Sequence, residues 1–370
     1  SSFILSACST SYVVEYIEEE GSNSGTWVRV NDGEQTKINA NLNGQVILNT
    51  AETDIDVFPA DSELSISTQG EDHFSMHIER KGSAPVKVSY QLNGEAVNRA
   101  AVSEQQLQLA WQSFFRLSGH SADERATRIV KNGGLSALLN EIEMIQSNLV
   151  TRRYIEHLVT SYALSDQEIT ETIAIIQNMS SNSQSSEAFS ALLSGKTALR
   201  ETQVIALVEA TDNITSNNAL STLLIDIINK PAHNQLSPAL ADSVLEAAKN
   251  ISSNNSLGDV LSQLLDKVDD QQIVAKLIKQ AGRNISSNNR LASLYTQTLD
   301  KDLGQDNMRL LLKSAGDNIS SSNGLADFVI NAIKSDNFSA EIIDDVTRVT
   351  KQIASSSRQS DVMELLNSLK

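Results

Sequence analysis

The stretch Asn250-Ile251-Ser252-Ser253-Asn254-Asn255 decides the fold of this chain, because its pattern returns along the sequence. It recurs almost unchanged as Asn284-Ile285-Ser286-Ser287-Asn288-Asn289 and as Asn318-Ile319-Ser320-Ser321-Ser322-Asn323. More divergent copies, at 178–182 and 213–218, precede it. The residues that stand at the position of Ile251 form a series with a period of about 34 residues: Ile145, Met179, Ile214, Ile251, Ile285, Ile319 and Ile353. Such a period predicts one helical unit per repeat, stacked on its neighbours.

Apolar residues surround each of these anchor residues at the three- and four-residue spacing of a helix. After Ile251 they follow at Leu257, Val260, Leu261, Leu264 and Leu265. Before it, Leu240, Val244, Ala247 and Ala248 form a second apolar face. Each repeat is therefore predicted to be a helix, a tight turn and a second helix, with the anchor residue packed under the turn. One longer interval is explained by the connection at 230–234, which contains Pro231.

The recurring Ser and Asn residues are of the types that cap helix N-termini and stabilise turns. Two other interpretations remain open. The turns could bind a ligand along one polar edge of the array, and the Asn-x-Ser/Thr pattern also matches the N-glycosylation acceptor. Because the pattern recurs at one repeat position, we favour capping. The Trp, Leu-Gly, Tyr and Pro signature of tetratricopeptide repeats is missing from these units.

Residues 25–98 have a different period, since apolar residues alternate there as they do in strands. We expect strands near 27–30, 46–48, 55–58, 64–66, 74–78 and 86–90, separated by Gly-containing turns such as Asn43-Gly44 and Asn93-Gly94. The pattern predicts a small β-rich domain, either an antiparallel sandwich or a short β-solenoid. His73 and His77 would lie about 13 Å apart by strand rise, too far for one metal ion. We therefore predict no metal site there.

A helical adaptor is predicted over residues 99–144, starting at Ser103 and carrying Trp111, Phe114 and Phe115. Gly119 should end its first helix. Ser121 and Glu124 are spaced as a capping box for the next, which should close at Gly133-Gly134. Arg116, Arg125 and Arg128, together with Glu141, could form a functional cluster. We favour the alternative that they tie the adaptor helices together, since charged residues on helices are usually structural.

The adaptor also carries a resemblance. Its Phe115-Arg116, Ser118-Gly119, Arg128-Ile129 and Gly133-Gly134-Leu135 positions, with Asn43-Gly44-Gln45-Val46-Ile47 upstream, are similar to those of uncharacterised exported bacterial proteins. In that family a β-rich N-terminal domain is followed by helix-pair repeats of an Ile-x-Ser-(Asp/Asn) type. The resemblance is one of architecture and implies no activity for individual residues.

The first residues resemble a second known signal. Leu5-Ser6-Ala7-Cys8 is similar to the lipobox of bacterial lipoproteins, in which cleavage before the cysteine precedes lipid attachment. The basic region and the longer apolar run of a full signal are missing upstream, so we expect the sequence to begin inside that signal. The resemblance implies lipid attachment at Cys8, and Ser9 suits sorting to the outer membrane. The alternative is a small apolar cysteine near a flexible terminus. Residues 1–24 are thus predicted to be a lipobox-like start and tether.

The composition and the missing motifs argue against several classes of function. A net charge of −17 without a basic stripe argues against nucleic-acid partners. The single cysteine allows no intrachain disulfide. Phosphate-binding loops, Gly-x-Ser-x-Gly, His-Glu-x-x-His and calcium-loop spacing do not occur in the sequence. We accordingly predict no catalytic, cofactor or metal residues and no cofactor.

The predicted fold class is α+β and multidomain: a β-rich domain and an adaptor, followed over residues 145–370 by an α-solenoid of repeats of about 34 residues. The predicted function is a non-catalytic, exported binding or scaffolding protein, a lipoprotein of the periplasm or outer membrane of a Gram-negative bacterium. It would bind a protein partner through the array and contact the membrane only through its lipid anchor. The alternatives are a cytoplasmic helical-repeat adaptor or regulator, and a hydrolase with a site where the β-rich domain meets the adaptor.

The repeat register makes a testable prediction. Ile285→Asp should melt the array at least locally, because it places a charge without a partner in the core, at a cost of about 3 kcal/mol or more. Thermal unfolding followed by circular dichroism measures the effect. An unchanged melting temperature would show that the register is wrong.

Overall fold

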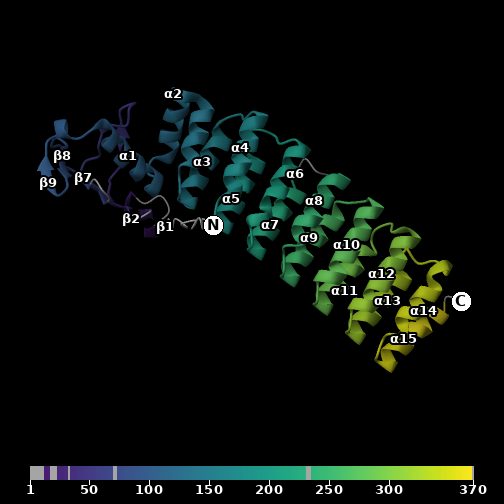
Figure 1. The fold of residues 1–370 in the computed structure, drawn as a ribbon. Helices are drawn as coiled ribbons and strands as arrows, with labels where there is room; N and C mark the ends of the chain where they lie inside the picture. The colour runs from purple at the N-terminus through teal and green to yellow at the C-terminus, as the bar shows by residue number, and fades with distance from the viewer. Residues whose placement is uncertain (1–11, 17–22, 32–33, 70–72, 231–234, 369–370) are drawn as a thin grey trace, which may run out of the picture. The chain divides into compact units, whose positions relative to one another are not determined.

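The computed structural model describes residues 12–16, 23–31, 34–69, 73–230 and 235–368. The chain forms two compact units, Ser1–Glu168 and Ile169–Lys370, and the division falls within helix α4 (Asp166–Gln177). Cys8 lies outside the described residues, as does most of the predicted connection at 230–234. The α+β fold class is confirmed: antiparallel strands come first and an array of helices follows (Figure 1).

In the first unit, the larger sheet has seven described strands in the order β1-β2-β3-β6-β7-β8-β9, all antiparallel. A separate two-stranded sheet pairs β4 with β5. β1 occupies part of the segment that the sequence predicts as a tether, and β3 and β9 were not predicted. The strands are β1 Tyr12–Tyr16, β2 Ser24–Asn31, β3 Glu34–Asn41, β4 Ile47–Leu48, β5 Ile55–Val57, β6 Ser62–Gln69, β7 Phe74–Arg80, β8 Lys87–Leu92 and β9 Glu95–Val97.

One face of the larger sheet is buried under helix α1 (Glu104–Ser118) and the β4–β5 pair. Alternating residues of the sheet, such as Ile38, Ile66 and Ile78, share one core with Trp111 and Phe114 of α1. The antiparallel pairing excludes the parallel coils of a β-solenoid. The second layer is a helix and a short strand pair, so it replaces the second full sheet of a sandwich.

The adaptor helices follow the predicted boundaries with one exception. Ser103 forms a complete capping box with Gln106, and Gly119 ends α1 in the left-handed conformation, at φ 65°. α2 (Ala122–Glu143) is interrupted at Gly134, which has φ 76°, where the sequence predicts the helix to close. The predicted capping box at Ser121 is wrong: Ser121 adopts φ 50° and its side chain makes no cap bond. Glu124 instead accepts a hydrogen bond from Gln45.

Two rows of helices build the second unit. One row contains the helices that follow the Ser-containing turns, packed side by side: α5, α7, α9, α11, α13 and α15. The other row contains α6, α8, α10, α12 and α14 (Figure 1). With α3 Asn148–Ser161 of the first unit, the remaining helices are α5 Asn182–Ser194, α6 Glu201–Glu209, α7 Asn217–Ile228, α8 Pro238–Ala248, α9 Asn254–Asp266, α10 Gln271–Asn284, α11 Asn288–Thr298, α12 Gly304–Asn318, α13 Ser322–Lys334, α14 Ile343–Thr350 and α15 Ser356–Asn367. Short 3₁₀ turns occupy Arg99–Ala101, Ala210–Asn213 and Ala340–Ile342.

The predicted repeat register is confirmed. All seven anchor residues are buried, with exposures between 1% for Ile251 and 9% for Met179. The apolar residues that follow Ile251, from Leu257 to Leu265 in helical spacing, have no exposed surface. The second Ser of the turn caps α7, α9, α11, α13 and α15, whereas Ser181 forms no side-chain cap bond at α5. Ser253, for example, accepts a hydrogen bond from the Ser256 amide at 3.3 Å, and Ser287 accepts one from the Arg290 amide at 3.4 Å.

The Asn that begins each of the helices α5, α7, α9 and α11 has a role that the sequence did not predict. The side-chain oxygen of Asn254 accepts two backbone N–H groups from the turn of the next repeat, that of Ser286 at 2.7 Å and that of Ser287 at 3.3 Å. We call this arrangement the Asn clamp. It recurs where Asn182 accepts from Thr215 and Ser216, Asn217 from Ser252 and Ser253, and Asn288 from Ser320 and Ser321.

Close packing between repeats also depends on a glycine. A Cβ atom added to Gly258 on α9 would lie 2.0 Å from Nε of Arg290, which crosses it from the next repeat. That arginine forms an ion pair with Asp259, and Arg358 and Asp327 repeat the pair further along the array. A side chain at Gly258 would therefore displace both the packing and the ion pair.

The Asn clamp predicts that Asn254→Ala destabilises the array by about 1–2 kcal/mol, because two turn amides lose their acceptor. Asn255→Ala is the matched control. Asn255 is the next residue of the same helix, is exposed and should change stability by less than about 0.5 kcal/mol. Urea unfolding followed by circular dichroism at the helical band compares the two variants. Equal effects would contradict the clamp.

Candidate functional site

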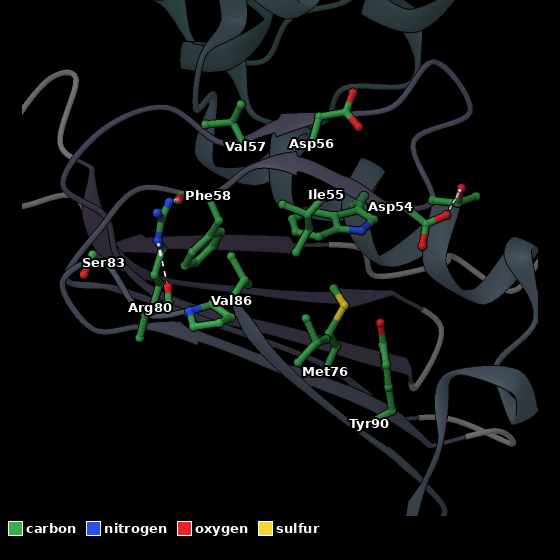
Figure 2. Close-up of a pocket in the computed structure, with 15 residues that line it drawn as sticks. Asp54, Ile55, Asp56, Val57, Phe58, Met76, Arg80, Ser83, Val86 and Tyr90 are labelled. Atoms are coloured by element: carbon green, nitrogen blue, oxygen red, sulfur yellow. Dashed lines mark hydrogen bonds between the residues drawn. The ribbon is translucent and has the colours of Figure 1, made fainter.

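A groove in the first unit is the best candidate for a functional site. It has a volume of about 620 Å³ and lies between β5 and the sheet strands β7 and β8. Figure 2 shows Ile55 and Phe58 on one side, and Met76, Val86 and Tyr90 on the sheet opposite them. The volume is within the range of sites that bind small molecules or short segments of chain.

The wall made by β5 is unusual because six consecutive residues, 53–58, line the groove. Successive side chains of a strand point to opposite faces. In Figure 2, Ile55 and Phe58 point toward the sheet, while Asp56 and Val57 point away from it. The groove therefore borders the edge of this segment as well as one of its faces.

The opposite wall is apolar and only partly covered. Val88 and Tyr90 alternate with the exposed residues Lys87 and Ser89 along β8. Val86, Val88 and Tyr90 pack against the edge of the main core but remain half-buried. Trp111 of α1 also lines the groove and is 1% exposed. This wall offers apolar surface that a ligand could cover.

The positively charged guanidinium of Arg80 lies at one end of the groove. Nη1 of Arg80 donates a hydrogen bond to the backbone oxygen of Phe58 at 2.7 Å, and Nε donates to that of Ala84 at 3.2 Å (Figure 2). Both acceptors are uncharged. The neighbouring carboxylate, Glu79, forms its ion pairs with Lys81 and Lys87. Within the described ranges, Arg80 has no carboxylate partner, so its charge is available to an anionic group.

The other end of the groove carries a paired carboxylate. Asp54 accepts a hydrogen bond from the Thr53 hydroxyl at 3.0 Å and lies 3.4 Å from Nε of Arg99. Burial raises the pKa of the nearby Tyr90 hydroxyl, and the charge of Asp54 raises it further against the opposing effect of Arg99. Tyr90 is therefore a neutral hydrogen-bonding group at physiological pH.

Behind the groove, the arginines singled out in the sequence form a buried ion network. Arg125, 2% exposed, binds Glu52 through Nε at 2.8 Å and Glu141 through Nη1 at 2.7 Å. Arg116 binds both oxygens of Glu141, at 2.8 and 2.7 Å. Arg128 reaches Glu52 at 2.9 Å. The network ties the loop between β4 and β5 to α1 and α2, which confirms the structural interpretation of this cluster.

Two further contacts hold Arg125 in place. Its guanidinium lies 5.1 Å from the ring centroid of Phe115 and 3.2 Å from the hydroxyl of Tyr154 on α3. Burial disfavours the charged forms of Glu52 and Glu141, but hydrogen bonds and charges of the surrounding arginines outweigh it and lower both pKa values. Both carboxylates thus stay ionised and are held by arginines, so this network has no free catalytic carboxylate.

A second, polar crevice lies where the β-rich domain meets the adaptor, with a volume of about 440 Å³. His157 stands between Asp123, 3.5 Å from its Nδ1, and the Thr127 hydroxyl, 3.0 Å from its Nε2. The order of groups is that of an acid–base–nucleophile chain. Thr127 lies inside α2, however, and its hydroxyl also bonds the backbone oxygen of Asp123 at 2.9 Å. Thr127 is also not among the residues that line the crevice, so its hydroxyl is not placed to meet a ligand there.

The remaining residues considered in the sequence do not gather at a site. His77 bonds the Ser65 hydroxyl at 2.9 Å, and the backbone of His73 bonds Asn93. In the part of the chain that the structure describes, no group of three or more His, Cys, Asp or Glu residues could hold a metal ion. The same residues contain no helix that is both long and apolar enough to cross a membrane. The signal for the groove was weak in the sequence, because its walls come from distant segments.

Comparisons with known proteins add little. No protein-family model and no curated protein match the chain, so no enzyme family is identified. Among solved structures, the chain is similar to one described as a computational design of self-assembling cyclic protein homo-oligomers. That match has 13% identity and a TM-score of 0.13, and it covers 69% of this chain and 91% of the designed one. At these values it carries no argument about fold or function.

His120, in the polar crevice, gives a prediction about pH. Its Nε2 accepts the Val46 amide at 3.1 Å, which requires the neutral ring. Burial lowers the pKa of His120 from 6.5 to about 4, although Glu124 opposes the shift. Between these values the unfolded chain binds a proton that the folded unit does not. The stabilising contribution is therefore complete above pH 6.5 and is lost as the pH falls toward 4.

We expect wild-type protein to lose about 1–3 kcal/mol more stability than His120→Gln across this window. Gln retains an acceptor for the Val46 amide but does not titrate. Tryptophan fluorescence isolates the first unit, because both tryptophans, Trp27 and Trp111, are buried there. Parallel pH profiles for the two proteins would refute the assignment.

Proposed function

We propose that this protein is a non-catalytic binding protein whose β-rich domain holds the ligand in its groove, while the helical array serves as a scaffold. The main support is the distribution of apolar surface. The described residues with large, exposed apolar side chains are Ile47, Val57, Leu109 and Met144, and all four belong to the first unit. Contiguous exposed apolar surface, such as that of Ile47 and Val57, marks binding sites, whereas single exposed residues such as Leu109 and Met144 are common on proteins.

Two of these residues sit beside the groove. Ile47 and Val57 are cross-strand partners in the β4–β5 pair and are 38% and 45% exposed. Val57 also lines the groove. The Val57 side chain points away from the sheet, so a ligand would cover this apolar pair where it extends over the rim of the groove, and the half-buried wall of β8 where it lies inside. That continuity supports binding on the β-rich domain.

The array is proposed to act as a scaffold that contacts a protein partner. Its polar turns are poor ligand sites, because the Asn clamp already uses the side-chain oxygen of the Asn that begins α5, α7, α9 or α11. The side-chain amide nitrogen of Asn254 also donates a hydrogen bond to the Ser286 hydroxyl at 3.3 Å. Partner contacts would then use the outer faces of the helices. The net charge of −17 makes nucleic acid an unsuitable partner.

Export and lipid anchoring remain part of the proposal. They are supported by the lipobox-like sequence at Leu5-Ser6-Ala7-Cys8. An acyl chain attached to Cys8 would hold the protein on a periplasmic or outer-membrane surface, since each buried CH₂ contributes about 0.8 kcal/mol. A cytoplasmic adaptor is the alternative, and the natural sequence upstream of Ser1 separates the two.

Metabolic labelling with palmitate tests the anchor. The protein expressed with its natural upstream sequence in a Gram-negative host should incorporate label, and Cys8→Ala should not. Membrane fractionation of both proteins provides a second readout. Absence of label from the wild-type chain would refute lipid attachment at Cys8.

Site-specific photo-crosslinking tests the position of the binding site. A photoreactive amino acid at position 57, beside the groove, should give ligand adducts in cells that express the protein. The same group at position 222, an exposed residue on α7 of the array, serves as the matched control. Adducts from position 222 alone would move ligand binding to the array and refute the proposed role of the groove.

A further inference from the structure

The edge of β5 that does not pair with β4 is available for hydrogen bonding. β4 pairs with β5 through Ile47↔Val57 and Leu48↔Ile55, and the register shifts between these pairs. Among the described residues, no loop or side chain forms a hydrogen bond with the backbone of 55–57 outside this pairing. Backbone N–H and C=O groups on an unpaired edge form a template for another strand.

The facing sheet supplies an apolar wall with the two-residue spacing of a strand. Val88 and Tyr90 alternate along β8 and line the groove, and Met76, the buried cross-strand partner of Tyr90, lies beside them. A peptide running along β5 would place every second side chain toward this wall. Apolar residues at those positions would cover surface that is now half-exposed.

Arg80 sets the charge of the ligand. Its guanidinium is oriented by two carbonyl oxygens, and it keeps further N–H donors on Nη1 and Nη2. Arginine binds carboxylates through such paired donors. The opposite end, where Asp54 already pairs with Arg99, does not require an anion. A carboxylate is therefore complementary to one end of the groove only, which gives the ligand a direction.

We propose that the groove binds an extended peptide segment of a partner protein, which adds as a strand to the free edge of β5 and places a carboxylate on Arg80. This inference rests on the proposed function, because it names the ligand class of the same groove. The carboxylate can be a C-terminal group or an Asp or Glu side chain, since both present the same oxygens to the guanidinium.

A fatty acid is the main competing ligand, because it also combines a carboxylate with apolar surface. It would leave the backbone edge of β5 without partners, whereas a peptide would satisfy it. The six-residue wall matches an extended peptide of similar length. These features favour a peptide over an acyl chain.

The test uses the full chain and fluorescent peptides of about seven residues, a length chosen from strand geometry. A synthetic array of sequences with alternating apolar positions is made in three forms: with a free C-terminal carboxylate, with a C-terminal amide, and with the amide plus an internal Glu. We expect binding to one or both acidic forms, and binding weaker by about tenfold or more for the neutral form. The form that binds identifies the source of the carboxylate.

Two comparisons make the result specific. Arg80→Gln should remove the preference for acidic peptides. Lys87→Gln, which removes one positive charge from the exposed face of β8, should retain that preference. N-methylation of alternate peptide amides, measured on the wild-type protein, should abolish binding even if the Arg80 variant folds poorly.

The peptide proposal is overturned if no acidic peptide binds, if N-methylation has no effect, or if palmitate binds in place of peptides. A photo-adduct from position 57 in the same protein would leave the proposed binding function intact. Absence of both adduct and peptide binding would reject the groove as a site altogether.

Discussion

One hydrogen-bond acceptor, the side-chain oxygen of Asn254 and of its counterparts, governs how the array is built. In four turns of the described array, two consecutive backbone N–H groups, such as those of Ser286 and Ser287, are both accepted by the Asn of the preceding repeat. The first residue of such a turn is exposed, as Ser286 is, and the second is half-buried, so the clamp joins neighbouring repeats at the rim of the core. These bonds fix which residues of neighbouring repeats lie opposite one another. Apolar packing between helices alone would not fix this register. At Ser322 the shorter side chain accepts only the amide of Ser355, at 3.2 Å, so that contact relies more on packing.

In the first unit, a buried ion network joins the β-strands to the helices. Arg125 is almost fully buried, and such a charge is tolerated only with close partners. Glu52 comes from the loop before β5 and Glu141 from α2, so satisfying one guanidinium fixes the loop against the helices. The same loop leads directly into the wall of the groove at Thr53. The network therefore positions the groove without contributing a free group to it.

The sequence predicted those features that arise from periodicity. The anchor residues, the paired helices and the Ser caps follow from spacing within one repeat, and all were correct except the cap at Ser181. The Asn clamp joins residues more than thirty positions apart, and a repeat pattern does not reveal which of its polar residues cross to the next unit. β3 was missed because only Ile38 and Ala40 are apolar and buried in it. The groove was not foreseen, since Asp54, Arg80 and Trp111 come together only through sheet pairing and helix packing.

The two units also differ in how their polar groups are satisfied, and this difference bears on function. In the array, polar side chains largely bond to the adjacent repeat, as Lys276 does with Asp242 and Asn307 with Gln271. Such a surface is stable by itself and gains little from a ligand. Among the residues that the structure describes, Arg80 is bound only by neutral carbonyl oxygens, and the β5 edge beside it has no hydrogen-bonding partner. Binding is strongest where the partner supplies interactions that the free protein lacks. By this physical criterion, the proposed ligand site is on the β-rich domain, where Arg80 and the β5 edge offer interactions that a partner can complete.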